Sequence, residues 1–363
     1  MTEKEKMLAG EWFSSPDEEL TVERRRAERL LHRLNVELTT DDEAYRTTLR
    51  ELLAPDSEGF IRAPFHCDYG YNISLGEGSF LNFGCVILDL APVRIGRRTL
   101  IGPNVQLLTA HHPFDVAQRA AGLEAGRPIT IGDDCWIGPG AVIHDGARIG
   151  KGCKIHTAAS IACLPQDLKF TGEVTTAEIG DYNDIREYVT ISRGTASRGK
   201  TVVGDHNLIM AYVHIAHDDV VGNHCVIANR VSLAGEVEVG DWVVIGGHVA
   251  VHQWTRIGAH AMVQGGSMVG KDIPPYVIVR NDTLRFAGIN KIGLSRRGFS
   301  QERIGEIHDA CRILFQSGLN YLAGCDEVER QIPRSDDRDM LLQFIRSSQR
   351  GIIKPYASDS EKA

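Results

Sequence analysis

Residues 203–269 read VGDHNLIMAYVHIAHDDVVGNHCVIANRVSLAGEVEVGDWVVIGGHVAVHQWTRIGAHAMVQGGSMV, with an aliphatic residue at every sixth position. These positions are Val203, Ile209, Ile215, Val221, Ile227, Leu233, Val239, Ile245, Val251, Ile257, Val263 and Val269. A step of six scatters residues around a helix, whereas in a strand an even step returns each residue to the same face. The pattern therefore predicts short strands stacked as a hexapeptide-repeat parallel β-helix, in which successive rungs bury their aliphatic side chains against one another.

The same step of six recurs upstream, so we expect most of residues 70 to 272 to form one β-helix. The upstream runs cover residues 75–87, 95–107, 131–161 and 179–191. Where the step fails, we expect segments extruded from the helix, at about residues 110–128, 163–176 and 193–200. Extruded surface segments are where binding and catalytic residues concentrate.

Both ends of the chain change from the strand period to a helical one. A solenoid needs such covers because its end rungs expose unpaired backbone and apolar surface. We expect an all-β solenoid with helical caps. Its predicted regions are an N-terminal helical region of sugar-acetyltransferase type over 1–55, the β-helix over 56–272 and a C-terminal helical domain over 273–363.

The helices themselves are predicted from their periodicity and their capping residues. Residues 3–53 are expected to form short amphipathic helices, and Thr40 with Glu43 is expected to form a capping box at the start of the last of them. Two further helices are predicted around residues 301–316 and 336–349.

Composition limits the classes of function. Lys plus Arg number 40 against 48 Asp plus Glu, a net charge of −8, and aromatic residues make up 7% of the chain, which argues against a nucleic-acid-binding protein. No apolar run is long enough to span a bilayer or resembles a signal peptide, so we expect a cytoplasmic protein.

The eight cysteines include no CxxC pair, and half of them lie four residues after an aliphatic repeat position. These are Cys85, Cys135, Cys153 and Cys225. Small apolar residues occupy the equivalent positions elsewhere, so we interpret the four cysteines as core residues and expect no metal site.

The chain resembles two families of hexapeptide acyltransferases, one after the other. Residues 1 to about 142 resemble the maltose and galactoside O-acetyltransferases in FHCDYGYNISLGEGSFLNFGCVILD and in TAHHPFD followed by RPITIGDDCWIGPGAVI. Residues from about 143 to 356 resemble the UDP-N-acetylglucosamine O-acyltransferase of lipid A biosynthesis in PQDLKFTGE, HIAHDDVVGN, VHQW and GINKIGLSRRGFS. Ile137, Ile143 and Ile149 keep the step of six across the seam near residue 143, so the helix is expected to continue through it.

The resemblance to the second family implies a fold and a function. Both families wind a left-handed β-helix and associate as homotrimers with active sites between neighbouring subunits. The implied reaction transfers a long 3-hydroxyacyl chain from acyl carrier protein to the 3-hydroxyl of UDP-N-acetylglucosamine, the first step of lipid A biosynthesis. The implied partners are acyl carrier protein and the nucleotide sugar, with the phosphopantetheine thioester as donor and no permanently bound cofactor.

The predicted catalytic centre is the HIAHD motif. A hydroxyl that attacks a thioester must lose its proton, and imidazole has a pKa near the working pH. The resemblance makes His217 the general base and Asp218 the residue that orients it. It also makes the backbone N–H of Gly235 the donor to the oxyanion, a task worth roughly 10²- to 10³-fold in rate. Glu236 follows that glycine, where the family often has histidine.

The resemblance also carries over residues for the acceptor and the acyl chain. The predicted substrate-binding residues are Gln166, Asp167, Lys169, His214, Gln253, Asn290, Arg296 and Arg297. Guanidinium groups suit the diphosphate because they donate two hydrogen bonds at once. The predicted acyl-chain groove contains His252, Met262 and Gly265, with the glycine leaving room for a long chain.

Two other functions stay open. The first half carries its own candidate site for acetyl-CoA-dependent sugar acetylation, with His112 as base and with Asn82, Asp89 and Arg24 around the acceptor. Leu90 stands where that family can have an acidic residue, and the later rungs of its donor site are replaced here, so we expect the His112 site to be impaired or silent. A nonenzymatic trimeric β-helix scaffold is the third alternative.

Overall fold

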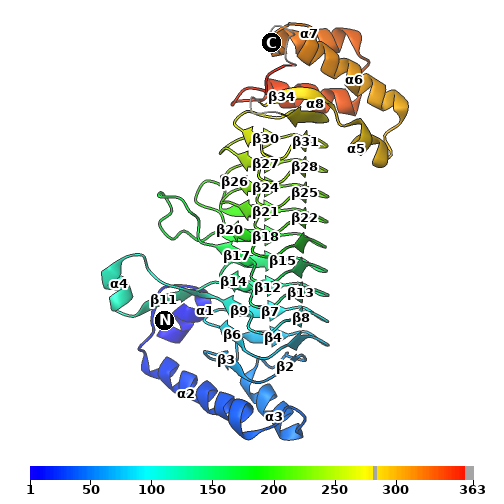
Figure 1. Ribbon diagram of the computed structural model, residues 1–363. Helices are drawn as coiled ribbons and strands as arrows, with labels where there is room; N and C mark the ends of the chain where they lie inside the picture. The colour runs from blue at the N-terminus through cyan, green and yellow to red at the C-terminus, as the bar shows by residue number, and fades with distance from the viewer. Residues whose placement is uncertain (281–283, 356–363) are drawn as a thin grey trace. The chain divides into compact units, whose positions relative to one another are not determined.

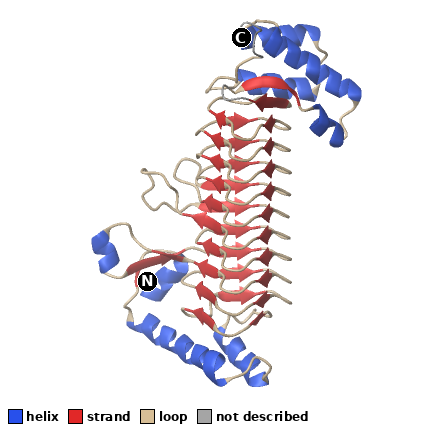
Figure 2. Ribbon diagram, viewed as in Figure 1, coloured by secondary structure: helices blue, strands red, loops and turns tan. Residues whose placement is uncertain are grey.

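The computed structural model describes residues 1–280 and 284–355. The chain divides into two compact units, Met1–His206 (unit 1) and Asn207–Ala363 (unit 2). Within each unit, short parallel strands repeat three to a rung and stack into three sheets (Figures 1 and 2). This is the parallel β-helix that the step of six predicts.

Unit 1 contains three parallel sheets that run along its β-helix. The first contains β2 (Phe60–Ile61), β5 (Phe80–Leu81), β8 (Leu100–Ile101), β13 (Trp136–Ile137), β16 (Lys154–Ile155) and β19 (Asp184–Ile185). The second contains β3 (Phe65–Cys67), β6 (Cys85–Leu88), β9 (Gln106–Leu108), β14 (Val142–His144), β17 (Ser160–Cys163) and β20 (Thr190–Ser192). The third contains β4 (Ile73–Leu75), β7 (Val93–Ile95), β12 (Ile129–Ile131), β15 (Ala147–Ile149), β18 (Thr176–Ile179) and β21 (Lys200–Val203).

The seam between the two resemblances lies inside unit 1, and strand pairing continues through it. Ile131 of β12 pairs with Ile149 of β15, and Ile143 of β14 pairs with Ile161 of β17, both in parallel register. Because a slip of one residue would turn every apolar side chain outward, the shared step of six keeps the two parts in register.

Helices of unit 1 cover its first rungs. They are α1 (Glu3–Ala9), α2 (Glu18–His32), a π-helical turn η1 (Arg33–Glu37) and α3 (Glu43–Leu52). The predicted capping box of Thr40 and Glu43 is wrong, because Asp42 is the N-cap of α3 and its side chain makes no cap hydrogen bond. The capping box lies at α1 instead, where Thr2 and Glu5 bond each other's backbone N–H. Both helix starts have the right residue types, and the local backbone decides between them.

The predicted extruded segments are present in unit 1, and the first has structure of its own. Residues 110–126 contain β10 (Ala110–His111), α4 (Val116–Ala120) and β11 (Leu123–Gly126). β11 pairs antiparallel with both β10 and β1 (Phe13–Ser14), so this arm is tied to the N-terminal region. The other two segments, 164–175 and 193–199, connect β17 to β18 and β20 to β21.

Unit 2 repeats the three-sheet pattern and ends in helices. Its first sheet contains β22 (Leu208–Ile209), β25 (Val226–Ile227), β28 (Val244–Ile245), β31 (Met262–Val263), β33 (Val277–Arg280) and β34 (Arg285–Ile289). Its second contains β23 (His214–Ile215), β26 (Ser232–Leu233), β29 (Ala250–Val251) and β32 (Met268–Val269), and its third contains β24 (Val220–Val221), β27 (Glu238–Val239) and β30 (Arg256–Ile257).

The helices of unit 2 are α5 (Lys291–Arg296), α6 (Gln301–Gln316), α7 (Tyr321–Gln331) and α8 (Asp336–Arg346). The helix predicted over 301–316 is confirmed, and the one predicted over 336–349 ends at Arg346. α6 packs on β34 through Phe315, whose ring stacks on Phe286 at 4.4 Å. Among the residues that the structure describes, no helix has the length and apolar character needed to cross a membrane.

The core confirms the sequence pattern. All twelve aliphatic residues of the step from 203 to 269 are buried, each with at most 3% of its surface exposed. The four cysteines at the equivalent inward positions, Cys85, Cys135, Cys153 and Cys225, are also buried. Each rung therefore contributes its apolar side chains to the interior.

Candidate active site

Three predicted site residues occupy equivalent positions on one corner of unit 2. His217 follows β23, Gly235 follows β26 and Gln253 follows β29, so each lies where the second sheet connects toward the third. They are spaced 18 residues apart, which is one full rung of three hexapeptides. Backbone bonds join the three turns: the Glu236 N–H donates to the His217 carbonyl, and the Trp254 N–H donates to the Gly235 carbonyl.

His217 is held by its neighbour. Its Nδ1 lies 2.9 Å from Oδ2 of Asp218, and the two side chains are 6% and 0% exposed. A carboxylate at this nitrogen favours the tautomer with the proton on Nδ1, which leaves the Nε2 lone pair free to accept a proton. Asp218 has a φ of 61°, a left-handed conformation that Asp tolerates better than most residues. The imidazole of His217 is therefore both buried and oriented.

Gly235 lies against the open edge of that imidazole. A Cβ at this position would be 2.9 Å from both Cε1 and Nε2 of His217, and the glycine has a φ of 93°. A side chain here would displace the ring and strain the backbone. Among the described residues, the Gly235 N–H has no protein acceptor. The glycine thus leaves space next to Nε2 of His217, and its backbone N–H bonds no described residue.

Asp219 is a residue of this corner that the sequence reading missed. Its carboxylate accepts from the Ala216 N–H at 2.9 Å and from the Val237 N–H at 2.8 Å, and it is completely buried. It therefore ties the turn of His217 to the turn of Gly235 on the next rung. The second Asp of HIAHDD was the available signal, because a buried carboxylate needs backbone donors.

The remaining predicted residues near this corner differ in exposure. His214 on β23 is half-buried, and burial lowers its pKa, with the nearby His217 as a second cause. Gln253 is half-buried and His252 is exposed, and Nδ1 of His252 lies 3.2 Å from the Gln253 carbonyl. Two of these residues, His252 and Gln253, follow β29 on the corner of His217. The third, His214, lies on β23, the strand that leads to His217.

The structure does not bring the acyl-groove glycine to this corner. Gly265 lies between β31 and β32, where the first sheet connects to the second. It is exposed, and a Cβ there would be 3.0 Å from the carbonyl oxygen of Gly247 on the preceding rung. Met262 lies on β31 with 38% of its surface exposed. These two predicted groove residues flank a different edge of the same unit.

The predicted nucleotide-binding residues lie at a third place. The Asn290 side chain caps α5, accepting from the Gly293 N–H and donating to the His260 carbonyl, and it is 5% exposed. Arg296 is exposed. Arg297 is half-buried: its guanidinium lies 5.3 Å from the Trp242 ring centroid and 3.3 Å from Nδ1 of His260.

Trp242 and His260 are further residues that the sequence reading missed. They belong to a series of aromatic corner residues at His224, Trp242 and His260, where the rings of His224 and Trp242 stack at 4.1 Å. Burial lowers the pKa of His260 to about 4, so it is neutral near neutral pH and does not repel Arg297. The spacing of 18 residues between them was the signal that could have identified this shared corner.

The predicted acceptor residues of the PQDLKF motif lie in unit 1. Gln166 and Lys169 are exposed, and Asp167 is half-buried. The Asp167 carboxylate accepts from the Lys169 N–H at 3.0 Å, which gives the segment a local turn.

The candidate site of the first half has a different character. His112 is exposed on the arm of residues 110–126, and the neighbouring His111 is the buried histidine. Arg24 donates to the Tyr69 hydroxyl and to the Ser15 carbonyl, both at 2.8 Å. The Asn82 side chain accepts from the Phe83 N–H at 2.9 Å.

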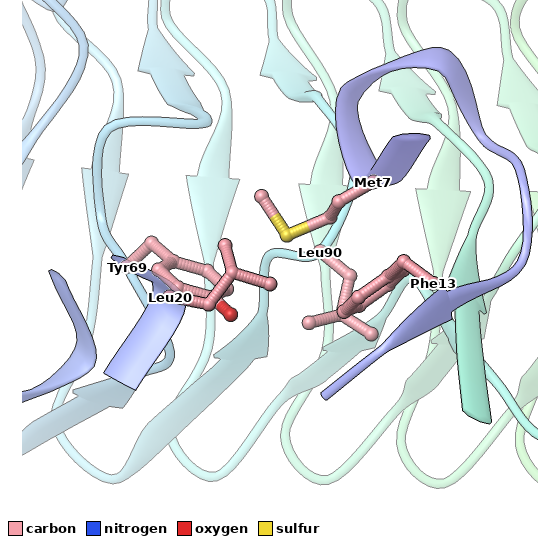
Figure 3. Close-up of a cluster of buried hydrophobic side chains, with 5 residues drawn as sticks. All are labelled: Met7, Phe13, Leu20, Tyr69 and Leu90. Carbon is pink, nitrogen blue, oxygen red and sulfur yellow. The ribbon is translucent and has the colours of Figure 1, made fainter. Parts of the chain in front are cut away.

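Asp89 and Leu90 fill the interior beside these residues. The Asp89 carboxylate is fully buried and accepts from the backbone N–H groups of Asp68, Tyr69 and Gly70, while burial raises its pKa to about 7. Leu90 packs in an apolar cluster with Met7, Phe13, Leu20 and Tyr69 (Figure 3). Acceptor binding by Arg24, Asn82 and Asp89 stays a prediction, and each of these side chains already bonds its own chain.

Three family models match parts of the chain. One, described as UDP-N-acetylglucosamine O-acyltransferase, domain 2, matches residues 272–353. The maltose acetyltransferase hexapeptide capping motif matches residues 6–56, and the bacterial transferase hexapeptide repeats match residues 128–163. Both resemblances predicted from the sequence are confirmed.

Sequence relatives and solved structures agree with these models. A Thermodesulfovibrio yellowstonii protein named acyl-(acyl-carrier-protein)–UDP-N-acetylglucosamine O-acyltransferase is 44% identical over 244 residues, which cover 64% of this chain and 95% of the relative. A Xylella fastidiosa protein of the same name is 43% identical over 54% of this chain and 75% of its own length. A solved UDP-N-acetylglucosamine acyltransferase from Bacteroides fragilis is 40% identical with a TM-score of 0.63, covering 82% of this chain and 98% of the other.

Proposed function

We propose that this chain transfers an acyl group from acyl carrier protein to UDP-N-acetylglucosamine, because it belongs to the acyl-(acyl-carrier-protein)–UDP-N-acetylglucosamine O-acyltransferase family. The observation that carries the proposal is the corner of unit 2 where His217, oriented by Asp218 at 2.9 Å, lies against Gly235. An oriented base beside a backbone donor is what acyl transfer from a thioester requires.

In the proposed reaction the sugar hydroxyl attacks the thioester carbonyl carbon. His217 Nε2 takes the hydroxyl proton as the new C–O bond forms, and the Gly235 N–H donates to the oxygen that becomes negatively charged. The tetrahedral intermediate then breaks its C–S bond, and His217 returns the proton to the leaving thiolate of the phosphopantetheine group. The histidine ends the cycle neutral, and the steps use no resident cofactor.

The resemblance extends the proposal to the 3-hydroxyl of the sugar, to a long 3-hydroxyacyl chain and hence to the first step of lipid A biosynthesis. Each methylene buried in the groove contributes about 0.8 kcal/mol of binding free energy. Gly265 supports a long chain because it is exposed and adds no side chain at its edge of unit 2. The proposal includes the cytoplasmic location that the sequence predicts.

The positions of the site residues support an active site shared between copies of the chain. Within unit 2, His217, Gly265 and Arg297 belong to three different corners of the rungs. Residues on separate corners of one β-helix face different directions, so a neighbouring copy is needed to bring a groove and a nucleotide site toward His217. The proposal therefore includes the homotrimer that the resemblance predicts.

The test is a transfer assay with purified protein, 3-hydroxyacyl carrier protein and UDP-N-acetylglucosamine, followed by chromatography of the nucleotide sugar. His217→Ala should lower kcat by roughly 10²- to 10⁴-fold, the usual contribution of a general base. His308→Ala removes an exposed histidine of α6 and should leave kcat unchanged.

A wild-type protein that acylates no nucleotide sugar would contradict the proposal, as would a His217→Ala variant that retains full activity. Acetyl transfer from acetyl-CoA to a galactoside, abolished by His112→Ala, would favour the first alternative instead. Light scattering on the same preparation measures the mass, and a fully active monomer would overturn the shared site.

A further inference from the structure

The extruded segments of unit 1 all leave from one corner, where the second sheet connects to the third. The arm (residues 110–126) lies between β9 and β12, and the acceptor loop (residues 164–175) lies between β17 and β18. The rung between them turns tightly at Asp145, and the rung after the loop carries the third extruded segment, which begins at Arg193. Because β9, β14, β17 and β20 are successive neighbours, the arm and the loop project from rungs two apart.

Aromatic side chains join the arm to the loop. The ring of Phe114 on the arm meets the ring of Phe170 on the loop edge to face, with centroids 5.9 Å apart. The ring of His111, also on the arm, meets Phe114 with centroids 6.1 Å apart. Gly172 of the loop lies against both, since a Cβ there would be 3.6 Å from His111 Nε2 and 3.9 Å from Phe114 Cε2.

A buried ionic network underlies this contact. Arg127, directly after the arm, donates to the Gly172 carbonyl of the loop at 3.1 Å, and its Nη1 lies 3.5 Å from the Asp145 carboxylate. Arg193 pairs with the same carboxylate and also lies 5.7 Å from the Phe170 ring centroid. Arg193 is completely buried, and Asp145 and Arg127 are 5% and 8% exposed. Breaking one partner of a buried ion network is costly, so the root of the loop is fixed.

The loop is thus anchored through Phe170 and Gly172, while other residues of it are exposed to solvent. Phe170 is 8% exposed, whereas Leu168 two residues earlier is fully exposed. Gln166 and Lys169 are exposed as well. The arm comes from the part of the chain that resembles sugar acetyltransferases, and the loop comes from the part that resembles the acyltransferase, so this contact links the two parts.

We propose that the arm serves as a brace for the acceptor loop, with Phe114 and Arg127 as positioning residues that hold Gln166, Asp167 and Lys169 ready for UDP-N-acetylglucosamine. This role rests on the proposed function, because that function makes these three residues contacts of the acceptor. If a binding loop is already held in its bound conformation, less conformational entropy is lost when the substrate binds. The brace acts on acceptor binding and leaves the donor step unaffected.

The test uses Phe114→Ala in the transfer assay together with hydrogen exchange of residues 164–175. The KM for UDP-N-acetylglucosamine should rise about 2- to 10-fold, the range expected for loss of one aromatic pair. The KM for acyl carrier protein should stay unchanged, and the loop should exchange faster. Phe114→Tyr keeps the ring and should restore both values. Phe83→Ala is the matched control, since Phe83 and Phe114 are 42% and 48% exposed and Phe83 packs on Arg62 instead.

The brace is overturned if Phe114→Ala matches Phe83→Ala in both acceptor KM and loop exchange. If Phe114→Ala does not fold, Phe114→Leu gives the same comparison, because it keeps apolar bulk and removes the ring. A wild-type protein without transfer activity would defeat the proposed function alone, and the exchange of residues 164–175 would still decide whether the arm holds the loop.

Discussion

Two histidines of the chain, His217 and His112, are candidates for the general base, and their environments in the structure differ. His217 is 5% exposed, has a carboxylate 2.9 Å from Nδ1 and lies against a glycine on its other edge. His112 is exposed on an extruded arm. A base needs a fixed ring and a place for the reacting atoms beside it. The comparison shows that the packing around a histidine motif decides what the motif can do in this chain.

The surroundings of the two histidines differ as well. At His217 the next rung contributes Gly235, and the missing side chain leaves room. In unit 1 the residues expected to surround an acceptor are engaged elsewhere: Asp89 accepts three backbone bonds, and Leu90 completes an apolar cluster with Phe13 and Leu20. The surroundings of Asp89 in unit 1 are packed as a core, whereas the corner of His217 in unit 2 leaves space beside the imidazole.

The comparison is tested most severely by filling the space beside His217. Gly235→Ala should lower kcat by roughly 10²- to 10⁴-fold, as much as removal of the base, because the new Cβ would lie 2.9 Å from the imidazole. Gly318→Ala is the matched control: Gly318 has a φ of 79° with nothing within 4 Å, so it shares the backbone strain of about 1 to 2 kcal/mol without the contact. Steady-state kinetics and thermal unfolding separate the two effects. Comparable kcat values for both variants would refute the importance of this space.

A smaller effect should follow from changing the residue that orients His217. Asp218→Asn should lower kcat by about 10²-fold, the lower end of a base's contribution, since the Asn amide can donate to Nδ1 and so favours a proton on Nε2. Asn also tolerates the left-handed φ of 61°. Asp134→Asn is the control, because Asp134 has a φ of 58° and pairs with Arg98 in exposed positions. A variant with wild-type kcat would mean that Asp218 supports the turn and not the tautomer.

The smallest effect should come from the other histidine. His112→Ala should change acyl-carrier-protein-dependent transfer by less than about 2-fold, because the side chain is exposed and the base of the proposed reaction lies in unit 2. The measurement is the same transfer assay, run beside an acetyl-CoA assay with a galactoside acceptor. A loss of tenfold or more in acyl-carrier-protein-dependent transfer would break the distinction between the two regions.

The step of six predicted the fold because it depends on local geometry alone. Alternate residues of a strand face opposite sides, so the aliphatic positions from Val203 to Val269 had to point inward together. The N-terminal capping residues were harder to predict, since Thr2 with Glu5 and Thr40 with Glu43 read alike in sequence. The paired strands of the arm were missed because β11 pairs with β1, more than 100 residues earlier.

The sequence by itself determined the β-helix, the inward cysteines and the motif around His217, because each follows from residues close together in the chain. The tertiary structure decided which residues meet across rungs. In the uninterrupted stretch a rung is 18 residues long, yet Arg98 pairs with Asp134 one rung away at a separation of 36. Extruded segments change that separation, so the contact of Phe114 with Phe170 depends on how far the arm and the loop leave the β-helix before they return.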